Sequence, residues 1–321
     1  MLKIIGNRKI KKSLAALTAL VAVLLAGCSD SEGTDTDQSQ DGVKVVATFY
    51  PVYEFAKKVV GEEGQVEMLL DAGQETHDFE ASPQDLAMIA EADVFVYATP
   101  YMETWVSDVL AALEGSDVKI VEAGAGIALF EEEEETPATE DLGGEEKYVV
   151  DPHIWLDPVY AQDMVATIST AVQEADSEKA AAYKQNTEQY IQELIQLDQE
   201  YQETFGQATN RTFVVQHSAF GYLARRYNLE EVAISSLTGN QEVSPANIVE
   251  VGNYMNVSGI DVIYYQDSAS SKVAETLAAE TGATLDILYA IESIPQKERE
   301  QGFDYLTLMR KNLEALKKEF K

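Results

Sequence analysis

The sequence predicts an α/β protein with two lobes, each built on a parallel sheet, and a long rigid helix that connects them. Three observations predict this fold. Short β-branched runs alternate with helical patterns up to residue 123, and the same alternation restarts after residue 210. One long helical pattern without strands lies between the two halves. Strand–helix alternation of this kind is typical of parallel sheets that are covered by helices.

The first lobe is expected to span residues 43–176. Its expected strands are 43–49, 66–70, 94–98 and 118–123, and its first helices are 52–61, 82–92 and 104–115. The second of these helices has a clear start, because Ser82 is a candidate N-cap and Pro83 occupies the first helical position.

The connecting helix is expected at residues 177–206, with Ser177 as its cap. Its apolar residues recur at spacings of three, four and seven, which places them in one stripe along a helix. The stripe consists of Tyr183, Tyr190, Leu194, Leu197, Tyr201 and Phe205. A helix of this length between two lobes predicts a stiff connector, although an ordinary surface helix would show the same stripe.

The second lobe is expected to span residues 207–321. Its expected strands are 212–218, 230–235, 261–267 and 284–290, and its helices are 219–227, 244–259, 271–282 and 305–320.

The N-terminal end predicts export. Residues 1–27 combine basic residues with a short apolar run, as a secretory signal does. The run ends in "LLAGC" at Cys28, the only cysteine, and this resembles a bacterial lipoprotein signal whose cysteine is lipidated. An ordinary cleaved signal followed by a chance cysteine is the alternative. Residues 28–42 lack a core-forming pattern and are expected to be a flexible tether.

The charge balance excludes nucleic-acid binding. The 321 residues carry a net charge of −33, and loss of segment 1–27 would leave 18 basic residues against 56 acidic ones. Phosphate contacts require basic patches, whereas an acidic surface suits a cationic ligand or simple solubility. The most acidic segment, 130–148, is expected to be a solvated loop or a weak cation-collecting loop.

The only three histidines each lie at an expected strand end or loop. His77, His153 and His217 therefore fall where open α/β sheets bind ligands. Three imidazoles are a recurring zinc arrangement, and each needs a partner for its second ring nitrogen. Structural histidines with ordinary hydrogen bonds are the alternative, because no H-x-x-H pair is present. Candidate partners in the sequence are Asp78, Asp151 and Asp157.

Three motifs in order, "THDFEASPQD", "DPHIWLDP" and "HSAFGYLARRYNL", resemble those of bacterial zinc- or manganese-specific solute-binding lipoproteins. The resemblance covers nearly all of the mature chain, including "SKVAETLAAETGA", and implies a metal site in the cleft between the lobes. It implies that His77, His153 and His217 are metal ligands. A histidine at the third position implies zinc, because manganese-type members tend to have a carboxylate there.

Two features depart from the resemblance. Zinc-type members commonly have a His-rich loop where this chain has "EEEEETPATEDLGGEE". Members of the family usually have a carboxylate as the fourth ligand, at the end of the strand before "SKVAET". This chain has Gln266 at that position, followed by Asp267. Either residue, or a water, could complete the site, and Asp267 is the preferred candidate.

The resemblance implies an extracytoplasmic zinc receptor that delivers Zn²⁺ to the permease and ATPase of an ABC importer. It would be a monomer, held at the bacterial cell membrane by a lipid on Cys28. A manganese receptor of the same family is the first alternative. A zinc-dependent hydrolase is a second, although the sequence has no HExxH or G-x-S-x-G motif. A surface adhesin is a third and could coexist with transport. An enzyme is not expected.

Overall fold

The computed structural model describes most of the chain that follows the expected tether. The described residues are 42–70, 74, 76–77, 79–133, 148–235, 237, 245–266, 271–294, 296–318 and 320. The expected signal, Cys28 and nearly all of the expected tether lie outside them, as does Asp267. Within the described ranges, none of the helices combines the length and the apolar character that crossing a membrane requires.

The N-terminal lobe contains a four-stranded parallel sheet in the order β2-β1-β3-β4. The expected strands are confirmed, with bounds β1 (Lys44–Ala47), β2 (Gln65–Met68), β3 (Val94–Tyr97) and β4 (Lys119–Glu122). Strands β1 and β3 are central and almost fully buried, which explains their continuous β-branched and aromatic runs.

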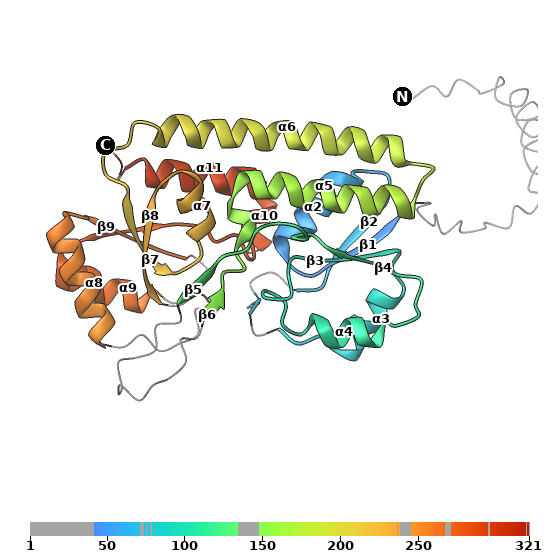
Figure 1. Ribbon diagram of the computed structural model, residues 1–321, viewed down its shortest axis with the longest axis horizontal. Coiled ribbons are helices and arrows are strands. Elements are labelled where there is room, and N and C mark those ends of the chain that lie inside the picture. The colour runs from blue at the N-terminus through green and yellow to red at the C-terminus, as the bar shows by residue number, and fades with distance from the viewer. Residues whose placement is uncertain are drawn as a thin grey trace, which may run out of the picture. The chain divides into compact units, whose positions relative to one another are not determined.

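Helices cover both faces of this sheet (Figure 1). On the face toward the connecting helix lie α2 (Tyr50–Val60) and α5 (Pro158–Ala175), and on the other face lie α3 (Pro83–Ala90) and α4 (Val106–Ala112). The predicted cap of α3 is confirmed. The Ser82 hydroxyl accepts from the Asp85 backbone, and the Asp85 carboxylate accepts from the Ser82 backbone.

The C-terminal lobe repeats the architecture with a parallel sheet in the order β10-β9-β7-β8. Helix α7 (Gly221–Arg226) follows β7, and a short α10 (Gln296–Glu300) precedes α11. The strands are β7 (Thr212–His217), β8 (Glu230–Ser235), β9 (Val262–Tyr265) and β10 (Thr284–Ile287), and the longer helices are α8 (Pro245–Ser258), α9 (Lys272–Thr281) and α11 (Tyr305–Leu316).

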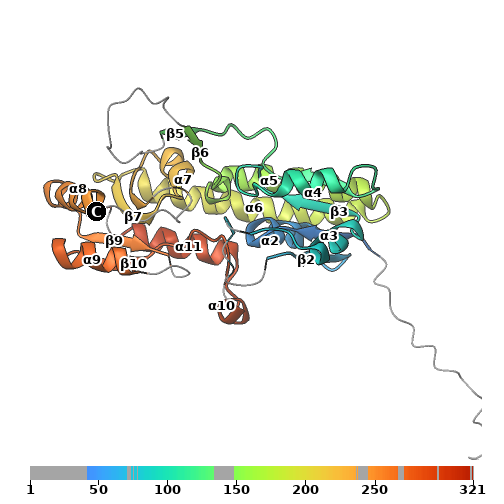
Figure 2. The ribbon, with the colours of Figure 1, turned by 90° about the horizontal axis from the view of Figure 1, so that it is seen from below.

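Helix α6 (Ala180–Phe205) runs along both lobes, as Figures 1 and 2 show. Every residue of its predicted apolar stripe is buried, and the stripe joins one apolar cluster with side chains of both lobes. A core shared in this way makes the connector stiff. The predicted cap was wrong: Lys179 precedes the helix, and its backbone nitrogen donates to Asp176 rather than to Ser177.

The expected acidic loop begins and ends in a small antiparallel hairpin. Strand β5 (Glu131–Glu133) pairs with β6 (Tyr148–Val150), and residues 134–147 lie outside the described residues. The chain leaving β6 enters "DPHIWLDP" at once, and a 3-10 turn, η1 (Ile154–Leu156), leads into α5. The hairpin thus places the segment that contains His153 at the junction of the lobes.

Candidate metal centre

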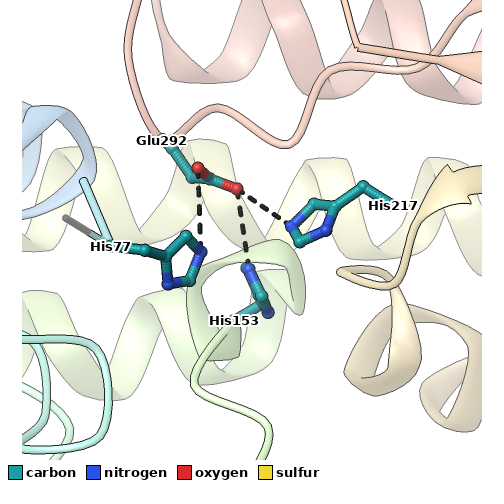
Figure 3. A group of neighbouring side chains, drawn as sticks. All are labelled: His77, His153, His217 and Glu292. Carbon is teal, nitrogen blue, oxygen red and sulfur yellow. Dashed lines mark ion pairs between the residues drawn. The ribbon is translucent and has the colours of Figure 1, made fainter. Parts of the chain in front are cut away.

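Four side chains from four separate segments converge between the lobes: His77, His153, His217 and Glu292 (Figure 3). His77 and His153 belong to the N-terminal lobe, and His217 and Glu292 belong to the C-terminal lobe. Each residue offers one ligand atom, and the four atoms lie within 4.8 Å of one another. The structure therefore brings the three predicted histidines together, with a carboxylate that sequence analysis did not select.

The spacing of these atoms suits a small divalent ion. Glu292 Oε1 lies 3.5 Å from both His153 Nε2 and His217 Nε2, and Glu292 Oε2 lies 4.0 Å from His77 Nε2. Zinc–nitrogen bonds of about 2.0–2.1 Å in a tetrahedron separate neighbouring donors by about 3.3 Å. Side-chain adjustments of about 1 Å or less would therefore place all four donors on one ion.

The site is largely closed to solvent. The side chain of His153 is fully buried, and the exposed fractions of the His217 and Glu292 side chains are 6% and 13%. The three imidazole rings lie 5.2–6.0 Å apart between centroids, at steep interplanar angles. Rings crossed in this way direct their nitrogens toward a common point instead of stacking.

Asp151 holds the ring of His153. Its Oδ1 accepts from the backbone nitrogen of His153 and lies 2.9 Å from the ring Nδ1. A proton on Nδ1 therefore faces the carboxylate and leaves Nε2, which faces Glu292, as the free donor atom. Of the candidate partners expected from the sequence, Asp151 contacts a histidine ring, whereas Asp78 lies outside the described residues.

Asp157 has a different task. Its carboxylate caps α5 through the Val159 backbone and forms an ion pair of 2.7 Å with Arg226 of α7. This pair links the two lobes, because α7 belongs to the C-terminal lobe.

Three further hydrogen bonds tie the segment 151–157 to the C-terminal lobe. The Tyr222 hydroxyl donates to the Asp151 carbonyl at 2.7 Å, and the Tyr305 hydroxyl donates to the Trp155 carbonyl at 2.6 Å. The Trp155 indole donates to the Ala290 carbonyl at 2.7 Å. Together with the Arg226–Asp157 ion pair, these contacts form what we call the inter-lobe clasp. It fixes His153 relative to the loop that bears Glu292.

The other two histidines are positioned by their own lobes. His217 is the last residue of β7, where its neighbours in the sheet fix the direction of the side chain. His77 lies in the loop after β2, and Phe79, two residues later, packs edge-on against Trp105 with ring centroids 5.0 Å apart. Both positions agree with the expectation that ligand sites lie beyond the carboxyl ends of parallel strands.

Glu292 follows a strained residue. Ile291 has φ of +59°, in the left-handed region that β-branched residues rarely occupy, and its side chain is buried. Such backbone strain persists where the surroundings enforce it, often beside functional groups. Here the turn at Ile291 lets the chain bury one side chain and direct the next toward the histidines.

Gln266 lies beside the group and contacts its carboxylate. It follows directly after β9, and its amide nitrogen donates to Glu292 Oε1 at 3.4 Å. Among the described residues, the carboxylate that joins the histidines is thus Glu292, beyond the neighbouring strand β10. The preferred candidate, Asp267, lies outside the described residues.

Electrostatics couple the histidines to Glu292. Burial disfavours a charged His153, but hydrogen bonds to Asp151 and Glu292 outweigh burial and raise the pKa of the imidazole to about 9. Burial also disfavours a charged Glu292, yet hydrogen bonds from His153 and His217 hold the pKa of its carboxyl well below the usual range. The metal-free site therefore favours a protonated imidazole beside a carboxylate, and an entering cation would displace that proton.

Comparison with known proteins identifies relatives over nearly the whole described chain. The family model "ZnuA: Zinc-uptake complex component A periplasmic" matches residues 45–319. The high-affinity zinc uptake system protein ZnuA of Bacillus subtilis is 39% identical over 297 residues, which cover 92% of this chain and 93% of that protein.

Solved structures give the same result. The Zn(II)-bound AdcA of Streptococcus pneumoniae is 38% identical, with a TM-score of 0.75, over 87% of this chain and 58% of AdcA. This chain thus spans little more than half of AdcA. The laminin-binding protein Lmb of Streptococcus agalactiae, described as bifunctional with adhesin and metal-transporting activity, is 31% identical. Its TM-score is also 0.75, over 87% of this chain and all of Lmb.

Proposed function

Because the chain belongs to the ZnuA family of zinc-uptake components, we propose that it is an extracytoplasmic receptor that binds Zn²⁺ with high affinity for import. The observation that carries this proposal is the convergence of His77, His153, His217 and Glu292 on one small, buried space. Three imidazoles and one carboxylate supply mostly nitrogen donors, which suit zinc better than manganese.

The donor set also favours binding over catalysis. Catalytic zinc sites usually have three protein ligands and keep one position open for water. In this site a fourth protein ligand, Glu292, lies within 3.5 Å of two of the imidazole nitrogens. A tetrahedral ion held by all four would have no water to activate, which supports a receptor over a zinc hydrolase.

Anchoring and partners complete the proposal. Residues 1–27 would be removed as a signal, a lipid on Cys28 would hold the chain at the membrane, and residues 28–42 would tether the lobes. The folded part would comprise the lobes 43–176 and 207–321 with the connector 177–206, and it would act as a monomer. It would deliver zinc to a permease and an ATPase, which are separate chains.

The test is a zinc titration of the chelator-treated protein against a chromophoric competitor. The proposal expects one tight zinc per chain, and His217→Ala and Glu292→Ala should each weaken binding by at least about 100-fold, because a ligand itself is lost. Glu200→Gln is the matched control, since Glu200 forms an ion pair with Arg310 on α11, away from the site. Wild-type zinc affinity in His217→Ala would refute the proposed site.

Turnover and metal choice are tested with the same protein. Zinc-loaded protein should show no hydrolysis of ester or peptide substrates above that of the same protein stripped of metal. Competition between metals should favour zinc over manganese. Hydrolysis that depends on bound zinc, or a preference for manganese, would contradict the receptor as proposed.

A second candidate function is adhesion, which the similarity to the laminin-binding Lmb supports. It would coexist with zinc binding, as that relative's description combines the two activities. Binding of the purified chain to immobilised laminin, compared with an unrelated acidic protein of similar charge, tests it. A signal no larger than that of the acidic control would exclude laminin as a partner.

A further inference from the structure

Gln266 contacts the proposed metal site although it is not one of the four proposed ligands. It lies just beyond the last residue of β9, partly buried, and its amide nitrogen is 3.4 Å from Glu292 Oε1. The same oxygen lies 3.5 Å from His153 Nε2 and from His217 Nε2. Gln266 therefore contacts the carboxylate oxygen that faces two of the three histidines.

The sheet order accounts for this arrangement. Strands β10, β9 and β7 are neighbours in that order, and all run parallel. The chain beyond β10 supplies Glu292, the end of β9 supplies Gln266, and the end of β7 supplies His217. Gln266 is thus built into the edge of the sheet between two of the metal-binding segments.

An amide at position 266 differs from a carboxylate in its charge and in its hydrogen-bonding role. The neutral amide N–H restrains Oε1 without adding a charge, so three neutral imidazoles and Glu292 give the donor set one negative charge. A glutamate at position 266 would fill the same space with a second carboxylate. It would add an oxygen donor and a second negative charge, which favour harder ions such as Mn²⁺ over Zn²⁺.

We propose that Gln266 is a positioning residue that holds the Glu292 carboxylate for a single-oxygen contact with the metal, and so favours zinc over manganese. This inference rests on the proposed function, because it requires zinc to bind at the four-residue site. It concerns selectivity and coordination geometry, which a merely structural residue would not alter.

The experiment measures zinc and manganese dissociation constants and the visible spectrum of the Co²⁺-substituted protein. Gln266→Met keeps the length of the side chain and removes the donor, and it should weaken zinc binding by about 10–100-fold. Gln266→Glu should shift the zinc-to-manganese affinity ratio at least about tenfold toward manganese. It should also weaken the strong absorption that four-coordinate cobalt shows, because a further oxygen joins the ion.

Gln202→Met is the matched control. Gln202 also donates to a carboxylate, that of Asp198, but on the exposed surface of α6. This variant should keep the wild-type dissociation constants and cobalt spectrum. Thermal unfolding of the metal-free proteins confirms that each variant folds, and if Gln266→Met does not fold, Gln266→Glu alone tests the inference through the ratio and the spectrum.

The outcomes separate this inference from the proposed function. If wild-type protein binds no zinc, the proposed function fails. If wild-type protein binds zinc tightly, a folded Gln266→Met within about twofold of its affinity would overturn the role of Gln266 alone. An unchanged metal ratio and cobalt spectrum in Gln266→Glu would overturn it as well.

Discussion

Replacing Asp151 by asparagine tests how a residue that does not itself join the ligand group tunes the site. Asp151 Oδ1 lies 2.9 Å from His153 Nδ1, and both side chains are fully buried. Asparagine nearly preserves the shape but replaces the charged acceptor by a neutral amide. The expected result is a weaker and less directional hydrogen bond to the ring of His153.

The magnitude follows from this geometry. A hydrogen bond to a charged group contributes about 1.5–3 kcal/mol, and water cannot replace it at a fully buried ring. Because each 1.4 kcal/mol is a factor of about ten, zinc affinity should fall by about 10–100-fold. Part of the loss arises because the asparagine amide can also stabilise the other tautomer, with the proton on the nitrogen that faces Glu292.

The assay is competition for zinc with a chromophoric chelator at neutral pH, using protein that has first been stripped of metal. Asp176→Asn is the matched control: Asp176 accepts from the Tyr183 hydroxyl at 2.8 Å beside the start of α6. That variant should lose stability but keep its zinc affinity. Equal zinc affinity in Asp151→Asn and wild type would refute the argument that Asp151 orients the ligand.

Three further predictions concern stability. Burial raises the pKa of Glu103 from 4.5 to about 7, so the folded state binds this proton more tightly than the unfolded chain does. Its contribution to the free energy of unfolding should therefore fall by about 3 kcal/mol between pH 4.5 and 7. Urea titrations at several pH values should show that the free energy of unfolding falls less steeply with pH in Glu103→Gln than in wild type. An equal fall in both proteins would contradict the assignment. Tyr305→Phe removes the bond to the Trp155 carbonyl and should cost about 1–3 kcal/mol by urea unfolding, whereas no loss would show that this bond is not stabilising. Free zinc at about 100 times its dissociation constant should raise the free energy of unfolding by about 2.7 kcal/mol, which corresponds to about 5–10 °C in Tm. The same rise in Tm in Glu292→Ala would argue that the stabilising zinc is bound elsewhere.

Much of the fold was predictable because its signals are local. The β-branched runs of β1, β3 and β7 indicate largely buried strands, and the apolar stripe of α6 indicates one buried helix face. The structure confirms both. The start of α6 was not predicted correctly, because Ser177 and Asp176 are both good capping residues. The helix begins only after Lys179, and Asp176 accepts from the Lys179 backbone and from the Tyr183 hydroxyl in the turn before it.

The candidate site was predictable only in part. The three histidines were selected because they are rare, lie at expected strand ends or loops, and fall in the three motifs that carry the family resemblance. Glu292 carries neither signal, since the chain holds many acidic residues and this one lies past the end of β10 in irregular backbone. The left-handed turn at Ile291 that directs it depends on tertiary packing. The available hint was that β10 ends at the same edge of the sheet as β9.

The inter-lobe clasp has a consequence for how long a bound ion would stay. Any hinge motion that separates the lobes at segment 151–157 must break three buried or partly buried hydrogen bonds and the Arg226–Asp157 ion pair. Together these contacts add about 3–6 kcal/mol to the barrier. Spontaneous opening would then be about 10²–10⁴ times rarer than without the clasp. A captured ion would therefore have a long residence time, and its rapid release would require an external event that loosens the clasp.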